Sequence, residues 1–202
     1  MGIGKKINGS TTYFRDEYIL DKCLNKTVLH VGCTDFPFFK ESLNQGFLLH
    51  EKVNQVAQKV IGIDIAQSEV QEMQSHGYDV RLFDAQKMST YQWKEKFDVV
   101  LLGDVIEHIP NIGLVIEESI KMLSQDGIIV ITVPNAFGII RFLKSFFKYE
   151  QVHPDHLVYF SSGTLETLAE RFDLKVREMA WYRFEARDPR LTVKVSAFLE
   201  RI

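Results

Sequence analysis

The sequence has few cysteines, no long apolar run and no excess of positive charge. Its two cysteines, Cys23 and Cys33, are too few for a disulfide framework or a cysteine-based zinc site. No apolar run approaches the ~20 residues that cross a bilayer, and the first ten residues lack the apolar centre of a signal peptide. The net charge of −3 argues against a nucleic-acid partner. These absences favour a protein of the reducing cytoplasm.

The 202 residues, 46% hydrophobic and 25% charged, are ordinary for one globular domain with an ample core. There are no internal repeats, low-complexity stretches or interdomain linkers. Residues 1–12 are polar and are expected to be loose. Residues 13–24 have the pattern of a short amphipathic helix. We therefore expect a single domain over 1–202.

The stretch from Thr27 to Pro37 organises the chain. A short apolar strand ends at Gly32, whose missing Cβ permits a sharp turn and a close approach to a ligand. A second strand, 59–65, ends with the carboxylate of Asp64. A glycine turn after one strand and an acid at the end of the next are typical of the nucleotide-binding half of a doubly wound sheet, where the acid accepts the ribose hydroxyls.

Strand and helix patterns alternate through the rest of the chain, which predicts a mostly parallel sheet. Two β-rich runs at the end predict a C-terminal antiparallel hairpin. Expected helices are 36–58, with a break at Gly46, 66–76 closed by Gly77, 111–124, 138–148, and 164–172 capped by Ser161 or Ser162. Further expected strands are 78–83, 97–102, 128–133, 174–184 and 191–199.

Four segments, VLHVGCT, VIGIDI, FDVVLLGDVIEHIP and GIIVITVPN, occur in that order. Together they resemble the class I S-adenosylmethionine-dependent methyltransferases over roughly residues 28–172. The Glu-His pair resembles small-molecule O-methyltransferases, including those of quinone biosynthesis. The resemblance implies an α/β, Rossmann-like fold with a seven-stranded sheet, and S-adenosylmethionine as the cofactor.

The resemblance also assigns residues at the strand ends to the cofactor. They are His30, Gly32, Cys33, Thr34, Asp64, Ile65, Asp84, Ala85, Gly103 and Val105. In this assignment Asp64 takes the ribose hydroxyls, Asp84 the adenine amino group, and Tyr13 or Arg15 the methionine carboxylate. The alternative for Asp64 is a helix cap, and for residues 13–24 a helix that merely packs on the sheet.

The glycine turn departs from the family pattern. The family usually has an acid where His30 stands, and glycines where Thr34 and Phe36 stand. A histidine can donate a hydrogen bond where an acid accepts, which changes how the cofactor's ammonium group is held. The spacing from Gly32 to Asp64 is also longer than usual, and the extra length lies in the helical region after the turn.

Two histidines, His108 and His156, are the candidate catalytic bases. A histidine has a suitable pKa for taking a proton from an alcohol acceptor; His153 is a weaker candidate. The alternative is that Glu107 and His108 only hold a loop. The order of Asp104, Glu107, His108 and His156 also resembles the metal site of small-RNA 2′-O-methyltransferases, although we expect no metal.

Residues 137–160 form an expected acceptor-side insertion. Within it, 138–148 has the pattern of a basic amphipathic helix rich in aromatic residues. It could be a lid over an apolar crevice, a homodimer contact or a helix on a membrane surface.

We therefore predict methyl transfer from S-adenosylmethionine to a small molecule. A faint resemblance of the residues near His50 to methyltransferases found with surface-polysaccharide enzymes favours a hydroxyl of a sugar or glycan precursor. A non-catalytic binding or assembly subunit is the alternative. A nicotinamide oxidoreductase is a weaker one, because its turn needs two glycines that this sequence lacks.

Overall fold

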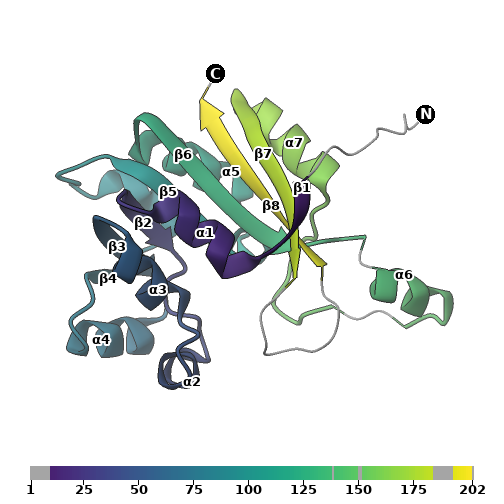
Figure 1. Ribbon diagram of the computed structural model, residues 1–202, viewed down its shortest axis with the longest axis horizontal. Helices are drawn as coiled ribbons and strands as arrows, with labels where there is room; N and C mark the ends of the chain where they lie inside the picture. Colours follow the sequence, from purple (N-terminus) through teal and green to yellow (C-terminus); the bar gives the residue numbers. More distant parts are fainter. Residues whose placement is uncertain (1–9, 138, 150–151, 184–192, 202) are drawn as a thin grey trace.

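An eight-stranded sheet with helices on both faces forms the centre of the molecule (Figure 1). The computed structural model describes residues 10–137, 139–149, 152–183 and 193–201. The strand order is β1-β7-β8-β6-β5-β2-β3-β4. The strands are β1 (Ser10–Phe14), β2 (Thr27–Val31), β3 (Lys59–Asp64), β4 (Val80–Leu82), β5 (Phe97–Gly103), β6 (Leu123–Pro134), β7 (Leu174–Arg183) and β8 (Val193–Arg201).

The strands from β2 to β6 are parallel, and β8 runs antiparallel to both β6 and β7. The chain leaves β2 toward β3 and β4 on one side, and β5 and β6 lie on the other. In this arrangement ligands bind beyond the carboxyl ends of the strands, where the order reverses between β2 and β5. The predicted α/β, doubly wound sheet with a C-terminal antiparallel hairpin is confirmed.

The predicted count of seven strands is wrong, because β1 adds an eighth at the edge of β7. Its register pairs Tyr13 with Tyr182 and Phe14 with Arg183. Thr11, Thr12 and Tyr13 are residue types that favour strands, so residues 10–12 belong to β1 rather than to a loose tail. The helix expected over 13–24 starts only at Arg15. Residues 1–9 lie outside the described part of the chain.

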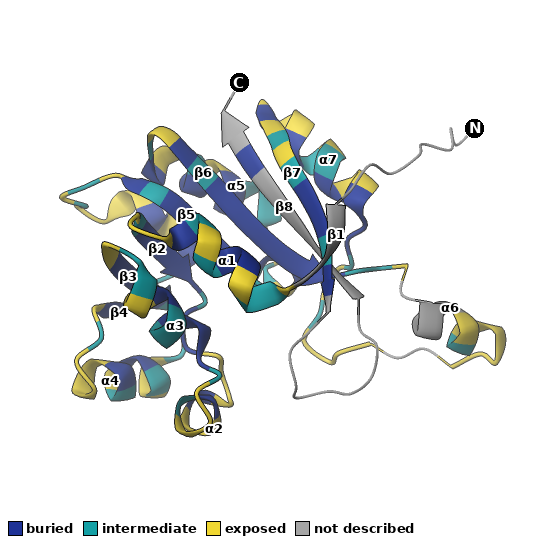
Figure 2. Ribbon diagram, viewed as in Figure 1, coloured by how far each residue is buried: buried dark blue, intermediate teal, exposed yellow. Residues whose placement is uncertain are grey.

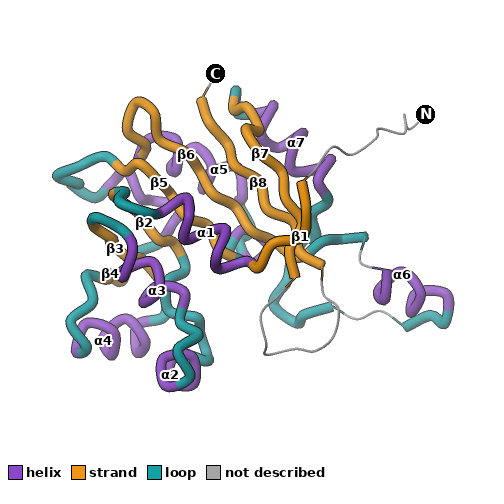
Figure 3. The backbone as a smooth tube through the Cα atoms, in the orientation of Figure 1, coloured by secondary structure: helices purple, strands orange, loops and turns teal. Residues whose placement is uncertain are grey.

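The helices divide between the two faces of the sheet (Figure 3). Residues of α1 (Arg15–Cys23) and α3 (Leu49–Val56) pack on Val28 and Val60, whereas α5 (Ile112–Met122) and α7 (Ser162–Arg171) pack on Leu29 and Ile61. Adjacent strand residues point to opposite faces, so both faces are apolar. The central strands are accordingly buried (Figure 2). The other helical segments are α2 (Phe39–Asn44), α4 (Gln67–Ser75), α6 (Ile139–Phe146), η1 (Ala85–Thr90) and η2 (Ile106–His108).

Local sequence signals explain where several helices start and end. Gly46 has a φ of +68° and separates α2 from α3, as expected. Gly77, at +87°, follows α4, and Ser161 begins α7 with a capping box to Thr164. No helix among the described residues is long and apolar enough to span a membrane.

Candidate active site

The turn after β2 packs against the loop that follows β5. Gly32 has a φ of +70°, and its N–H donates to the carbonyl of Ile63 across 2.9 Å. A Cβ built on Gly32 would overlap Cγ2 of Val105. Only glycine fits at this point. Two of the predicted cofactor residues, one directly after β2 and one after β5, therefore lie in contact.

The acid at the end of β3 is held by the turn after β2. The N–H and the hydroxyl of Thr34 both donate to Oδ2 of Asp64, at 3.1 and 2.9 Å. The N–H of Ala66 donates to Oδ1 at 3.0 Å. Thr34 is fully buried. Ile65, the residue after Asp64, is 74% exposed. Asp64 thus helps to shape the turn, and an apolar side chain stands open next to it.

Asp84 lies one strand further along, after β4, which pairs with β3 through Asp64 and Leu82. Its Oδ1 accepts the N–H of Gln86 at 2.9 Å and caps η1. Ala85 is buried in the core. The two acids assigned to the ribose and adenine thus follow neighbouring strands, and both also accept local backbone hydrogen bonds.

A pocket opens beside the β2 turn. It is lined by Arg15, Asp16, His30, Gly32, Cys33, Asp35, Phe47, Leu48, Leu49 and Gly103. Four of the predicted cofactor residues are therefore in its wall: His30, Gly32, Cys33 and Gly103. The other six, Thr34, Asp64, Ile65, Asp84, Ala85 and Val105, are not.

A buried pair of histidines stands where the family usually has an acid. Nδ1 of His30 and Nδ1 of His50 are 3.2 Å apart, and the rings stack with centroids 5.3 Å apart. Burial lowers the pKa of His50 to about 4. Burial, then His50 and Arg15, lowers the pKa of His30 well below 6.5. Both rings are neutral near pH 7, and one Nδ1–H donates to the other nitrogen.

Arg15 reaches from the start of α1 to the end of β5. Its Nη2 lies 3.3 Å from Oδ2 of Asp104, and the arginine side chain is 12% exposed. Burial opposes the charge, but Asp104 and other anions raise the pKa of Arg15 overall. Asp104 has a φ of +55°, and its N–H donates to the carbonyl and hydroxyl oxygens of Thr132. A charged, mostly buried arginine therefore borders the pocket.

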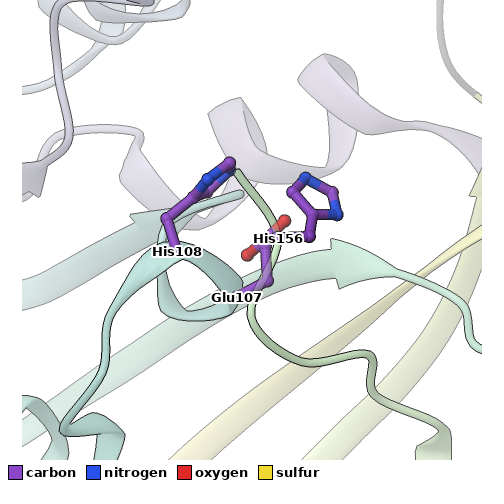
Figure 4. A group of neighbouring side chains, drawn as sticks. All are labelled: Glu107, His108 and His156. Carbon is purple, nitrogen blue, oxygen red and sulfur yellow. The ribbon is translucent and has the colours of Figure 1, made fainter. Parts of the chain in front are cut away.

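The segment after Asp104 meets the segment before α7 at a cluster of Glu107, His108 and His156, which we call the histidine cluster (Figure 4). One potential ligand atom from each residue lies within 4.8 Å of the others. The N–H of Leu157 donates to the carbonyl of Glu107 at 2.8 Å. Nδ1 of His108 lies 3.1 Å from the carbonyl of Asp155. These bonds hold together two segments almost fifty residues apart, including both candidate bases.

The cluster combines a buried carboxylate with two accessible imidazoles. Glu107 is 1% exposed, and Figure 4 shows its carboxylate between the rings of His108 and His156. Burial lowers the pKa of His108, so this imidazole is neutral near pH 7 and can accept a proton. Two nitrogens and a carboxylate also suit a divalent transition metal.

Sequence reasoning missed the partners of the site rather than its members. The sequence predicts a cofactor role for His30, but its contact with His50 depends on how α3 packs on the sheet. Tyr182, buried close to Asp104 and Arg15, carries no sequence signal. Burial, and then Asp104, raises the pKa of this phenol well above 10.

The fold and the strand-end site define a Rossmann-like α/β protein of the nucleotide-binding class. A family model described as a methyltransferase domain matches residues 18–179. The chain therefore belongs to the methyltransferase domain family.

Curated relatives of the chain are named for O-methylation. The chain is 31% identical over 114 residues to a ubiquinone biosynthesis O-methyltransferase of Pelagibacter ubique, covering 55% of this chain and 43% of that protein. An enzyme of the same name from Bartonella bacilliformis is 28% identical over 127 residues, covering 60% and 46%. The chain thus matches less than half the length of these relatives.

Solved structures share the fold at low identity. A SAM-dependent methyltransferase from Archaeoglobus fulgidus superposes with a TM-score of 0.62 at 15% identity, covering 92% of this chain and 90% of that one. Magnesium protoporphyrin IX methyltransferase from Synechocystis, with bound S-adenosylhomocysteine, gives 0.64 at 13%, covering 93% and 82%. These similarities show the fold.

Proposed function

We propose that the chain is an S-adenosylmethionine-dependent methyltransferase that acts on a hydroxyl of a small molecule. One observation carries the proposal: the pocket beside Gly32 and the histidine cluster both adjoin the loop after β5. Gly103 lines the pocket, and Glu107 and His108 follow within five residues. A methyl donor in the pocket would thus lie near a proton acceptor. The match to the methyltransferase domain favours this function over the nicotinamide oxidoreductase.

The pocket suits the amino-acid end of the cofactor. Arg15 offers a charged guanidinium to a carboxylate. The neutral pair of His30 and His50 offers a ring nitrogen in place of the family's usual acid. Asp64 and Asp84 keep further lone pairs for the ribose and adenine, since a carboxylate accepts about four hydrogen bonds. Ile65 supplies an exposed apolar surface for the purine.

The cofactor, when bound, supplies a methyl group on a sulfonium that is already an activated leaving group. The chain's own task is to align the acceptor oxygen in line with it. His108 or His156 accepts the hydroxyl proton as the new carbon–oxygen bond forms, and Glu107 stabilises the resulting imidazolium. General-base catalysis of this kind raises the reaction rate about 10²–10⁴-fold.

The relatives described above are named for ubiquinone biosynthesis, and their names give no support to our expectation of a sugar or glycan-precursor hydroxyl. An O-methyltransferase fits both classes. A panel of phenolic and sugar acceptors therefore belongs in the test.

Titration calorimetry with S-adenosylhomocysteine tests the proposal. We expect binding in the micromolar range, weakened at least tenfold by Asp64→Asn. The matched control is Asp79→Asn, an exposed acid between α4 and β4 that is not among the predicted cofactor residues. No binding at millimolar ligand would support the non-catalytic subunit instead. Binding without methylation of any acceptor in the panel would leave the cofactor site intact and overturn the choice of acceptor.

A second candidate role for the histidine cluster is to hold a divalent ion. The ligand atoms of Glu107, His108 and His156 lie within 4.8 Å of one another, and this donor set fits a transition metal. Such an ion would bind and polarise the acceptor hydroxyl. The base and the ligand roles exclude each other for a given imidazole nitrogen, so chelation separates them.

A further inference from the structure

The segment from Phe137 to Val158 exposes a large amount of apolar surface. It contains more than half of the exposed large hydrophobic side chains among the described residues: Phe137, Leu143, Phe146, Phe147, Tyr149, Val152, Leu157 and Val158. Phe147 is 84% exposed and Phe146 69%. Exposed apolar surface of this extent marks an interaction site more often than chance.

The helix at the centre of this segment, α6, stands away from the sheet and from the other helices (Figure 1). Leu143, Phe146 and Phe147, on this helix or directly after it, are more than half exposed. A lid needs its apolar side chains against the crevice that it covers. The geometry instead presents them outward, and this favours a separate surface as their partner.

The charge of this segment is opposite to that of the chain. Residues 137–149 contain Arg141, Lys144 and Lys148 and no acidic residue, whereas the chain as a whole carries −3. Arg141 and Lys144 belong to α6, and Lys148 lies two residues after the end of the helix. Nζ of Lys144 lies 5.4 Å from the centroid of the Tyr149 ring. Basic and aromatic side chains are thus interleaved.

The end of α6 has a defined shape. Lys148 has a φ of +56°, and its N–H donates to the carbonyl of Ser145 at 3.0 Å. The N–H of Tyr149 donates to the carbonyl of Lys144 at 3.2 Å. Together these bonds form a Schellman motif. The motif fixes the direction of the chain directly after the exposed Phe146 and Phe147.

We propose that α6 and its C-terminal end, residues 137–149, dock the protein on an anionic lipid surface. Aromatic and leucine side chains enter the boundary between headgroups and acyl chains, and the lysines pair with anionic headgroups. Because this segment carries only positive charges while the chain as a whole is negative, an anionic surface attracts this segment more strongly than the chain on average. The proposal is independent of methyl transfer.

Docking would also orient the histidine cluster. The chain continues after Tyr149 to His153 and His156. The N–H of Leu157 then donates a hydrogen bond to the carbonyl of Glu107 at 2.8 Å. The helix α6 ends ten residues before His156, so a surface that holds the helix would restrict the position of the cluster.

Vesicle flotation of the whole chain tests the proposal. We expect it to float with vesicles of phosphatidylcholine and 30% phosphatidylglycerol, and to stay in solution with phosphatidylcholine alone. Raising the salt from about 0.05 to 0.5 M should release it, because the Debye length shrinks severalfold. Lys144→Gln with Lys148→Gln should weaken binding roughly thirtyfold, and Phe146→Ser with Phe147→Ser should abolish it.

Matched controls separate docking from a loss of folding. Lys94→Gln with Lys175→Gln removes the same charge from exposed positions elsewhere, and Leu24→Ser removes another exposed apolar side chain. Both should float like the unaltered chain, and the α6 variants should keep their far-ultraviolet circular dichroism. No flotation with the anionic vesicles would overturn the proposal, as would an equal loss in the control variants. Self-association without lipid, lost on Phe146→Ser with Phe147→Ser, would replace it with a dimer contact.

Discussion

The hydroxyl of Thr34 donates to Oδ2 of Asp64 across 2.9 Å, beside the N–H of the same threonine at 3.1 Å. Thr34 stands where related turns usually have a glycine. The glycine's usual role is to let the backbone approach, yet here the buried threonine ties the turn after β2 to the acid of β3. The altered turn is therefore compatible with a correctly placed carboxylate, and the loss of the glycine is no sign of a damaged site.

This link predicts different effects for two small substitutions. Thr34→Ser keeps the hydroxyl, whereas Thr34→Val keeps the shape and removes it. We expect Thr34→Val to cost about 1–3 kcal/mol of unfolding free energy, since the hydrogen bond is to a charged acceptor. Its affinity for S-adenosylhomocysteine should fall about tenfold. Urea unfolding and calorimetry measure both, and a Thr34→Val protein equal to Thr34→Ser would contradict the role given to the hydroxyl.

The central strands could be predicted because buried parallel strands have a simple pattern. Segments such as 28–31, 60–63 and 97–102 are short, nearly continuous apolar runs, which are typical of strands covered on both faces. The positions of Gly32 in the first turn and Asp64 at the end of the second strand could be predicted because each stands at the end of such a run. The edge strand β1 has neither a continuous apolar run nor a glycine or acid at its end. Its pairing with β7 joins residues about 170 positions apart in the sequence.

Contacts between side chains inside the site could not be predicted either, because they join residues from different parts of the chain. His30 and His50 meet because α3 packs closely over β3 at Gly62. A Cβ at Gly62 would lie 2.9 Å from Cε1 of His50 and 2.6 Å from Sγ of Cys33. Such a contact depends on the packing of a helix on a sheet, which no local pattern encodes. The roles of Asp64, Asp84, His108 and His156 stay predictions.

Gly32 and Gly46 offer a matched pair of alanine substitutions. Both have φ near +70°, so alanine costs about 1 kcal/mol of backbone strain at either position. At Gly46 the new Cβ meets nothing within 4 Å, whereas at Gly32 it overlaps Val105. We expect Gly32→Ala to cost about 1–3 kcal/mol more than Gly46→Ala in unfolding free energy. Equal costs for the two variants would mean that the Val105 contact is easily relieved.

The histidine pair predicts a loss of stability in mild acid. The folded protein keeps His50 neutral with a pKa of about 4, against 6.5 in the unfolded chain. The unfolded state therefore binds more protons below pH 6.5, and stability falls as the pH drops from 6.5 to 4. For His50 the loss amounts to about 3 kcal/mol, and His30 adds to it in the same direction.

Unfolding free energies measured between pH 7 and 4 check this slope. His50→Phe keeps an aromatic ring and should flatten the slope, whatever its effect at pH 7. His76→Phe changes an exposed histidine at the C-terminal end of α4 and should leave the slope as it is. If both variants retain the full slope, the acid sensitivity comes from other groups.

The histidine cluster leads to opposite expectations for its two candidate roles. If His108 or His156 is the base, turnover should survive dialysis against a chelator, because no ion takes part. It should also rise with pH through a value below 6.5 and then level off, since a base must be neutral and burial lowers the pKa of His108. Because the lowered pKa is that of His108, His108→Asn should reduce turnover about 10²–10⁴-fold without weakening S-adenosylhomocysteine binding, and His76→Asn should leave both unchanged. We expect this pattern, because an imidazole held neutral beside a buried carboxylate is already competent to take a proton.

Turnover that disappears on dialysis and returns with a divalent ion would instead make Glu107, His108 and His156 ligands, and the acceptor hydroxyl would then lose its proton while bound to the ion.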